Sequence, residues 1–284
     1  MSDKVFILFL RILHNLFKLN NILRLSMNLL FGPGGTGSPA AEGLKIIADK
    51  GLKVAELEFT HGVNMSNETA KKVGEVAKRL GMSLSIHAPY YINLASEEPE
   101  KITASKKRIL DCCERGHHLT AKYIVFHAAY YGKLGKEECF RIVKKEMLEM
   151  QKVIAKNKWN AVLCPETTGK GSQFGTEDEL VRLSLETGCG VCVDFAHIYA
   201  RNNGKINYDE VMPKIKKVKE LTCHFSGIEY TEKGERRHIL TPTDKIKELL
   251  AAAKKHNISL RIINESPEPL ADAEKMQGIW ENFK

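Results

Sequence analysis

The chain has 284 residues, of which 43% are hydrophobic and 27% are charged. This balance excludes a disordered or fibrous protein and allows a large buried core. The formal net charge of +8 favours polyanionic partners such as nucleic acid but does not require them. Seven cysteines, an odd number scattered among apolar residues, favour reduced thiols and a cytoplasmic location over a disulfide framework.

Residues 1–26 form a leader whose apolar residues are interrupted too often by basic ones to cross a membrane. Two interpretations stay open: an amphipathic helix at a membrane interface, or an extension upstream of a start at Met27. We therefore expect a leader over 1–26, one catalytic domain over 27–284 and no membrane span.

Beyond Met27, short β-rich runs alternate with longer segments of helical period, which is the pattern of parallel βαβ units. Strands are predicted near 28–32, 54–60, 83–88, 122–128, 160–166, 189–195, 221–226 and 259–265. Helices are predicted near 38–50, 67–80, 99–118, 136–157, 176–187, 207–219, 243–256 and 270–282. Eight such units predict a single-domain α/β protein with the (β/α)8, or TIM barrel, fold.

Each of the last six predicted strands ends in a histidine or an acidic residue. These residues are His87, His127, Glu166, Asp194, His224 and Glu265, and His197 follows Asp194 by three positions. Active sites of this fold lie at the C-terminal ends of the strands, so we expect these side chains to converge on one rim. Imidazole and carboxylate together are ligands for zinc, manganese or iron. The pattern predicts a metal-dependent enzyme.

The number of ligands indicates more than one metal. Four of the residues, Glu166, Asp194, His224 and Glu265, are enough for one ion. His87 and His127 on the adjacent strands predict a second ion that shares Glu166 as a bridge. Paired ions about 3.5–4 Å apart clamp the attacking and leaving oxygens of a phosphate ester. We therefore expect phosphodiester hydrolysis, with Glu166 as the central catalytic residue.

The motifs around these residues resemble those of the endonuclease IV family of abasic-site endonucleases. They are HAPYYINL at 87–94, FHAAYYG at 126–132, PETTGKGSQFG at 165–175, VCVDFAHIYA at 191–200, HFSG at 224–227 and INES at 263–266. The resemblance implies a zinc-dependent endodeoxyribonuclease of DNA repair, for which Mn2+ is an alternative ion. Its substrate would be double-stranded DNA, cut 5′ to an abasic site. We expect a monomer.

By the same resemblance, His87, His127 and Glu166 would bind one zinc, Asp194, His224 and Glu265 a second, and His197 a third.

At the third site the chain departs from the family pattern. The family completes it with an Asp-x-His pair, where this chain has Arg236, Arg237 and His238. His238 fits as a ligand, but the aspartate is missing. Two outcomes stay open: Glu235 replaces the aspartate, or the third site is weak and the two arginines contact phosphate instead.

Two further segments bear on DNA recognition. Tyr90 matches the family's aromatic residue near the DNA, where a ring can fill the gap left by a flipped abasic sugar or stack on a base. The segment EFTHGVN after the second strand lacks the arginine with which the family enters the duplex. Within the second strand, Glu56 and Glu58 alternate onto one face and are expected to point into the barrel.

A rival hypothesis comes from the sugar isomerases and epimerases of the xylose isomerase-like barrel superfamily, which use a similar quartet. One divalent metal would then polarise a ketose, and Glu166 and Glu265 would move a proton between adjacent carbons. The altered third site fits this hypothesis better, whereas His87 and His127 favour the nuclease. A barrel that binds metal or nucleic acid without turnover is the remaining alternative.

Overall fold

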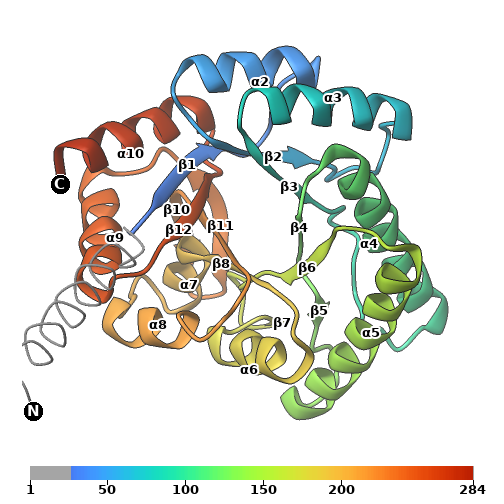
Figure 1. The fold of residues 1–284 in the computed structure, drawn as a ribbon. Coiled ribbons are helices and arrows are strands. Elements are labelled where there is room, and N and C mark those ends of the chain that lie inside the picture. Colours follow the sequence, from blue (N-terminus) through green and yellow to red (C-terminus); the bar gives the residue numbers. More distant parts are fainter. Residues whose placement is uncertain (1–26, 284) are drawn as a thin grey trace, which may run out of the picture.

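Two parallel four-stranded sheets form the centre of the protein, which we describe from a computed structural model covering residues 27–283. The strand orders are β1-β12-β9-β8 and β2-β3-β4-β6. Parallel bridges between Gly34 and Glu56 and between Glu166 and Cys192 join the sheet edges. The eight strands therefore close into a barrel with helices around it (Figure 1), and the predicted (β/α)8 fold is confirmed. The leader predicted over 1–26 lies outside the described residues.

The predicted alternation of strands and helices is present throughout the barrel. The barrel strands are β1 (Leu29–Pro33), β2 (Val54–Glu58), β3 (Ser83–His87), β4 (Tyr123–Phe126), β6 (Val162–Pro165), β8 (Val191–Asp194), β9 (Leu221–Phe225) and β12 (Leu260–Asn264). The outer helices are α2 (Ala40–Asp49), α3 (Asn67–Arg79), α4 (Pro99–Leu119), α5 (Lys136–Asn157), α6 (Glu177–Thr187), α8 (Tyr208–Ile215), α9 (Thr243–His256) and α10 (Pro269–Phe283). Most strand residues are buried, because helices cover the barrel outside and side chains fill it inside.

Local sequence signals set several helix boundaries. The Ser66 hydroxyl accepts a hydrogen bond from the backbone N–H of Thr69 at the start of α3. Thr176 and Glu179 form a reciprocal capping box at the start of α6, which ends at Gly188 with φ of 74°. Such caps satisfy N–H groups that a helix end would leave unpaired.

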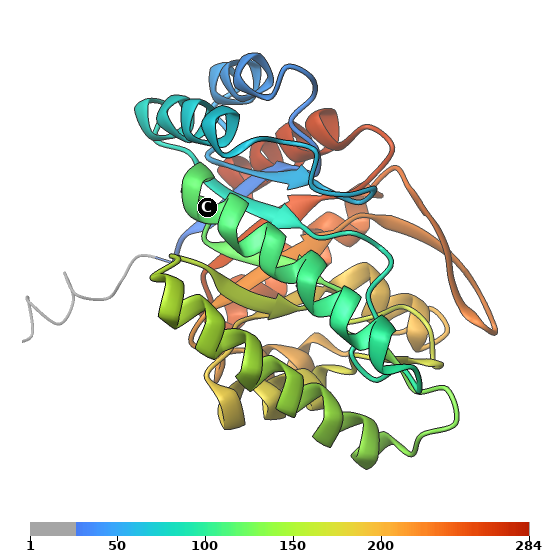
Figure 2. The ribbon, with the colours of Figure 1, turned by 90° about the vertical axis from the view of Figure 1, so that its right-hand side faces the viewer.

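Three features of the C-terminal rim, made of one helix and four short strands, were not predicted. The short helix α7 (Phe195–Arg201) begins directly after β8. The strands β10 (Gly227–Thr231) and β11 (Gly234–Ile239) form an antiparallel hairpin. Two-residue strands β5 (Ala129–Tyr130) and β7 (Gln173–Phe174) pair across two rim loops. The hairpin projects beyond the ends of the barrel strands (Figure 2), so all three features shape the rim on which the candidate site lies.

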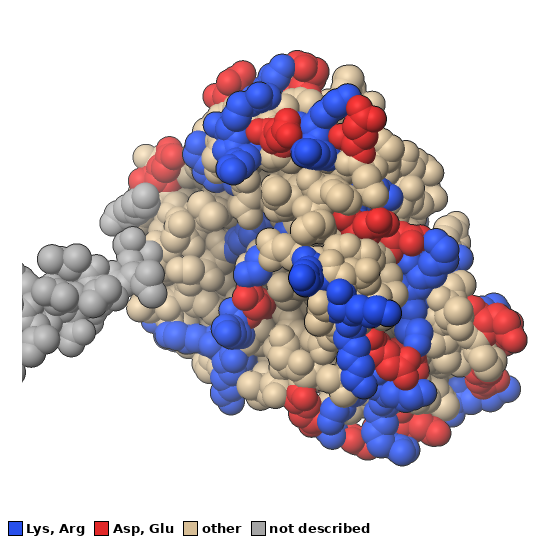
Figure 3. All heavy atoms as spheres, turned by 45° about the vertical axis from the view of Figure 1, so that its right-hand side comes forward, with Lys and Arg blue, Asp and Glu red and all other residues tan. Residues whose placement is uncertain are grey.

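Charges of both signs are mixed over the face of the molecule in Figure 3, where Lys and Arg side chains lie among Asp and Glu side chains. The net charge of +8 is therefore not gathered into one basic field on that face. All seven cysteines are buried, and none is in a disulfide. Within residues 27–283, no helix has the length and apolarity that a membrane span needs.

Candidate metal centre

Seven of the eight predicted ligands meet at one place on the C-terminal rim, and the eighth, His238, lies on the hairpin strand β11. The seven are His87 at the end of β3, His127 after β4, Glu166 after β6, Asp194 at the end of β8, His197 in α7, His224 in β9 and Glu265 after β12. Strand register aligns them, since Asp194 lies beside His224 in the β8–β9 pair. All seven are buried except His127 and Glu265, which are half-buried. The convergence expected from the sequence is therefore present.

Glu166 lies at the middle of the cluster, and each of its oxygens faces a different pair of imidazoles. Its Oε2 lies 3.3 Å from His87 Nε2 and 3.1 Å from His127 Nε2. Its Oε1 lies 3.1 Å from His224 Nδ1 and 3.3 Å from His197 Nδ1. A carboxylate in this position can bridge two ions, one on each side.

The donor atoms of the eight predicted ligands form three overlapping groups suited to cations. In each group one donor atom per residue lies within 4.8 Å of the others: His87, His127 and Glu166; Glu166, Asp194, His224 and Glu265; and Asp194, His197 and His238. Three of the atoms, Glu166 Oε2, Asp194 Oδ2 and His197 Nε2, are buried without a hydrogen-bond partner among the described residues. Buried polar atoms are costly unless they are paired or coordinate metal. The residues therefore fit metal ions.

The third group contains the departure noted in the sequence. His238 Nδ1 contacts the hydroxyl of Ser226 at 2.6 Å, which leaves its Nε2 available to the group. Where the family aspartate is missing, Glu235 Oε2 lies 3.4 Å from His197 Nε2. Arg237 is exposed and forms a bidentate pair with Glu229. Its contact with phosphate stays a prediction.

A β-bulge in the hairpin explains how Glu235 reaches the cluster. Tyr230 pairs with Glu235 and Glu229 with Arg237, so Arg236 is an extra residue without a partner in the register. Residues 235 and 238 would face opposite sides of a regular strand, and the extra residue brings both to one side. Glu235 also donates its backbone N–H to the carbonyl of Gly169 at 3.0 Å.

Gly169 is needed for this close approach. A Cβ at position 169 would lie 2.5 Å from the Cβ of Glu235 and 2.6 Å from its Oε2. Any larger residue there would displace the Glu235 carboxylate from the cluster. The loop 167–175 and the hairpin thus position Glu235 together.

The carboxylates hold protons on the imidazoles of the metal-free centre. Burial alone would lower the pKa of His87, but the close contact with Glu166 and the charge of Glu58 raise this pKa to about 10. The pKa values of His197 and His224 also lie well above the usual range, because surrounding carboxylates outweigh burial. Although burial opposes it, the imidazoles, chiefly His224 and His127, keep the pKa of Glu166 well below its usual range. A metal ion would have to displace these protons.

A polar cavity of about 240 Å³ opens beside the cluster. It is lined by Gly34, Glu58, Thr60, Tyr90, His238, Glu265 and Ser266. Tyr90 is 57% exposed, and its ring centroid lies 5.7 Å from that of His87. Tyr90 therefore stands at the entrance to the centre, and its contact with substrate stays a prediction. Arg236 is exposed on the hairpin, and its substrate contact stays a prediction.

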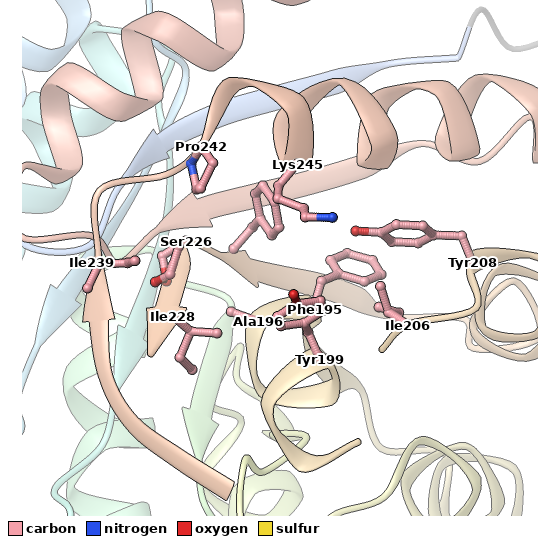
Figure 4. A pocket seen from close by; sticks show the side chains of 12 residues that line it. Phe195, Ala196, Tyr199, Ile206, Tyr208, Ser226, Ile228, Ile239, Pro242 and Lys245 are labelled. Atoms are coloured by element: carbon pink, nitrogen blue, oxygen red, sulfur yellow. The ribbon is translucent and has the colours of Figure 1, made fainter. Parts of the chain in front are cut away.

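A second cavity, of about 110 Å³, lies between α7, the hairpin and α9 (Figure 4). Its walls are mainly apolar, with Phe195, Tyr199 and Ile228 among them, and the Lys245 ammonium lies at its edge. In the described part of the chain, none of the clustered histidines or carboxylates lines it. This cavity is therefore separate from the centre.

Sequence reasoning does not fix the contacts of two acidic residues near the centre. For Glu235 the sequence leaves alternatives open. Glu56 was expected to face the barrel interior, and it does, but its 2.9 Å contact between Oε1 and His224 Nε2 was not foreseen. The alternation of Glu56 and Glu58 along β2 was the only sign of this contact in the sequence.

Comparison with known proteins places this geometry in a family. A family model described as Xylose isomerase-like TIM barrel matches residues 44–221. The chain is a member of that family. A relative from Methanocaldococcus jannaschii, named as an uncharacterized protein, is 35% identical over 254 residues, which cover 84% of this chain and 92% of that protein.

Similarity to endonucleases supports the resemblance seen in the motifs. A probable endonuclease 4 of Carboxydothermus hydrogenoformans is 29% identical over 182 residues, which cover 62% of this chain but only 59% of that relative. The structure of endonuclease IV from Thermus thermophilus has a TM-score of 0.67 at 18% identity, and the match covers 90% of this chain and all (100%) of that one. The resemblance to endonuclease IV is confirmed.

The fold alone does not select an activity. The structure of D-psicose 3-epimerase from Clostridium cellulolyticum also has a TM-score of 0.67, at 12% identity, with 90% of this chain and 98% of that one covered. Solved structures with either name thus share this fold, and the choice between the two activities depends on the residues of the site.

Proposed function

We propose that the chain is a metal-dependent phosphodiesterase that hydrolyses double-stranded DNA 5′ to abasic sites. One observation carries the proposal: Glu166 Oε2 lies between His87 Nε2 and His127 Nε2, at 3.3 and 3.1 Å. Sugar chemistry at one ion needs only the quartet on the other side of Glu166. The added imidazole pair is what a bridged two-metal phosphoesterase centre needs.

The ligands divide between the ions as follows. His87 and His127 would hold one ion together with Glu166. The same carboxylate would hold the second ion with Asp194, His224 and Glu265. Zinc suits this set of imidazoles and carboxylates, and manganese is the alternative. When bound, such ions stabilise charge on a phosphate and lower the pKa of water.

The protein side of the reaction is positioning. Glu166 would be the catalytic residue because its two carboxylate oxygens face the imidazoles of both proposed ion sites. Glu265, half-buried at the wall of the 240 Å³ cavity, lies where a substrate phosphate would enter. Tyr90 stands at the same entrance and would fill the space beside the extruded abasic sugar or stack on a neighbouring base.

The third group extends the proposal to a third ion. His197 and His238 would bind it, with Glu235 in place of the family aspartate, since its Oε2 lies 3.4 Å from His197 Nε2. Arg236 and Arg237 would remain on the outer side of the hairpin, where a DNA backbone could pass. We further propose a monomeric, cytoplasmic enzyme.

A ketose isomerase or epimerase is the second candidate. The quartet of Glu166, Asp194, His224 and Glu265 suffices for it, and the D-psicose 3-epimerase structure shares the fold. The specific observation in its favour is Glu58 on the cavity wall. A carboxylate there disfavours a polyanion and suits sugar hydroxyl groups.

The deciding experiment is cleavage of a labelled duplex that carries one synthetic abasic site, with enzyme of measured metal content. Wild type should cut 5′ to the lesion. Glu166→Gln and His87→Ala should not cut, whereas His117→Ala, a histidine on α4 outside the cluster, should cut normally. No cleavage by fully metallated wild type would refute the nuclease, and turnover of a ketose panel would then support the epimerase.

A further inference from the structure

A chain of buried polar side chains crosses the barrel interior beneath the metal centre. It runs from Arg261 on β12 through Ser85 on β3 and Glu56 on β2 to His224 on β9. All four are buried. Barrels of this type usually fill their interior with apolar side chains, and a buried carboxylate and guanidinium are costly there. The presence of these polar groups therefore needs a reason.

The direction of the protons along this chain follows from the donors. Arg261 Nη1 lies 3.1 Å from Ser85 Oγ, and a guanidinium can only donate. The single proton of Ser85 is then free to go to Glu56 Oε2, at 2.5 Å. Glu56 is thus an acceptor, held with its other oxygen toward His224.

The contact between Glu56 and His224 ends the chain. Glu56 Oε1 lies 2.9 Å from His224 Nε2, and neither atom has another hydrogen-bond partner among the described residues. The two atoms are at ion-pair distance, but the carboxylate oxygen does not lie along the direction of the ring N–H bond. The opposite nitrogen, Nδ1, lies 3.1 Å from Glu166 Oε1 and 3.2 Å from Glu265 Oε1, inside the quartet.

We propose that Glu56 is a positioning residue that keeps the proton of His224 on Nε2, so that the Nδ1 lone pair is presented to the metal. A neutral imidazole carries one proton, and the partner of one nitrogen decides which nitrogen can bind a metal. Ser85 and Arg261 hold the carboxylate in place for this role. The inference rests on the metal centre of the proposed function and not on its substrate.

The variant Glu56→Gln tests this role with little change of shape. Its amide N–H can donate a hydrogen bond to an unprotonated His224 Nε2 and so favours the tautomer whose proton blocks Nδ1. We expect about 10–100-fold weaker Zn2+ binding at one site, with the number of sites unchanged. The measurement is competition between metal-free protein and a chromophoric chelator. Glu220→Gln removes a carboxylate that pairs with Lys122 and lies outside the centre, so it should bind Zn2+ as wild type does.

Two outcomes of the titration would overturn the proposal. Zn2+ affinity equal to that of wild type would show that Glu56 does not position His224. Loss of a whole binding site would show that Glu56 is itself a ligand, in a group with Glu58 and Glu265.

A second readout reports the tautomer directly and covers the case in which Glu56→Gln does not fold. Nitrogen-15 spectra of the imidazoles should show His224 protonated at Nε2 in the zinc-loaded wild type. A wild-type protein in which the proton is on Nδ1 instead would refute the role. Ser85→Ala keeps the carboxylate but removes its proton donor, so it should weaken Zn2+ binding in the same direction by less. Neither experiment uses DNA. Both therefore remain valid tests of Glu56 even if the protein proves not to cleave DNA.

Discussion

Metal binding should release protons from the centre, and its affinity should rise steeply with pH. The perturbation is a change of pH between 6 and 10. Carboxylates raise the pKa of His87 to about 10, against opposing burial, so at pH 7 its imidazole is protonated in metal-free protein. At a pH three units below the pKa, removing the proton costs roughly 4 kcal/mol, because each unit corresponds to about 1.4 kcal/mol. His197 and His224, whose pKa values are also raised, add to this cost.

The sign follows from the raised values. Protonated histidines stabilise the metal-free protein below their usual pKa of 6.5, and that stability is lost as the pH rises through about 10. Over the same range the protons stop competing with metal, so zinc affinity should increase by about tenfold per pH unit for each proton displaced, and level off above pH 10.

Isothermal titration calorimetry in buffers of different ionisation enthalpy counts the released protons. We expect more than one proton per centre at pH 7. The control is His127→Ala, which removes one imidazole and one ion site and should reduce the metal count. An affinity that does not change between pH 6 and 9, with no buffer-dependent heat, would refute the reasoning.

Three further predictions concern the rim. Gly169→Ala should displace the Glu235 carboxylate and lower metal content by up to one ion, measured by atomic emission; full occupancy would show that Glu235 is not a ligand. Arg237→Ala should weaken DNA binding and reduce the slope of log affinity against log salt by about 1, and an unchanged slope would assign it to its pair with Glu229 alone. Tyr90→Ala should weaken binding of abasic DNA by about 1–3 kcal/mol in a fluorescence titration, with zinc content as the control; equal affinity would exclude stacking.

The barrel could be predicted because each strand is a short apolar run that ends at a polar residue. In a closed parallel barrel all such ends meet on one rim, so the positions of His87, Glu166 and Glu265 in the sequence were enough to predict their meeting. Their role as metal ligands stays a prediction. The structure adds the distances that make it specific.

The rim elements could not be predicted, for two physical reasons. Helix α7 follows β8 without a break, since Asp194 both ends the strand and caps the helix, and VCVDFAHIYA is apolar across the junction. Strand β11 has polar residues at successive positions, GERRHI, so no period of two marks it as a strand. The contact between Glu56 and His224 could not be predicted because His224 lies on β9, far from Glu56 in the sequence.

The bulge at Arg236 affects how relatives of this protein should be compared. A sequence alignment compares ligands position by position. It would show the acidic residue of the third group as absent, because Arg236 stands at the position of the family aspartate. In the folded hairpin a carboxylate lies 3.4 Å from His197, supplied by the preceding residue. The absence of a motif residue from a bulged rim strand is therefore weak evidence that a family member is inactive. Such members are better classified by the register of the hairpin than by the residue type at one alignment position.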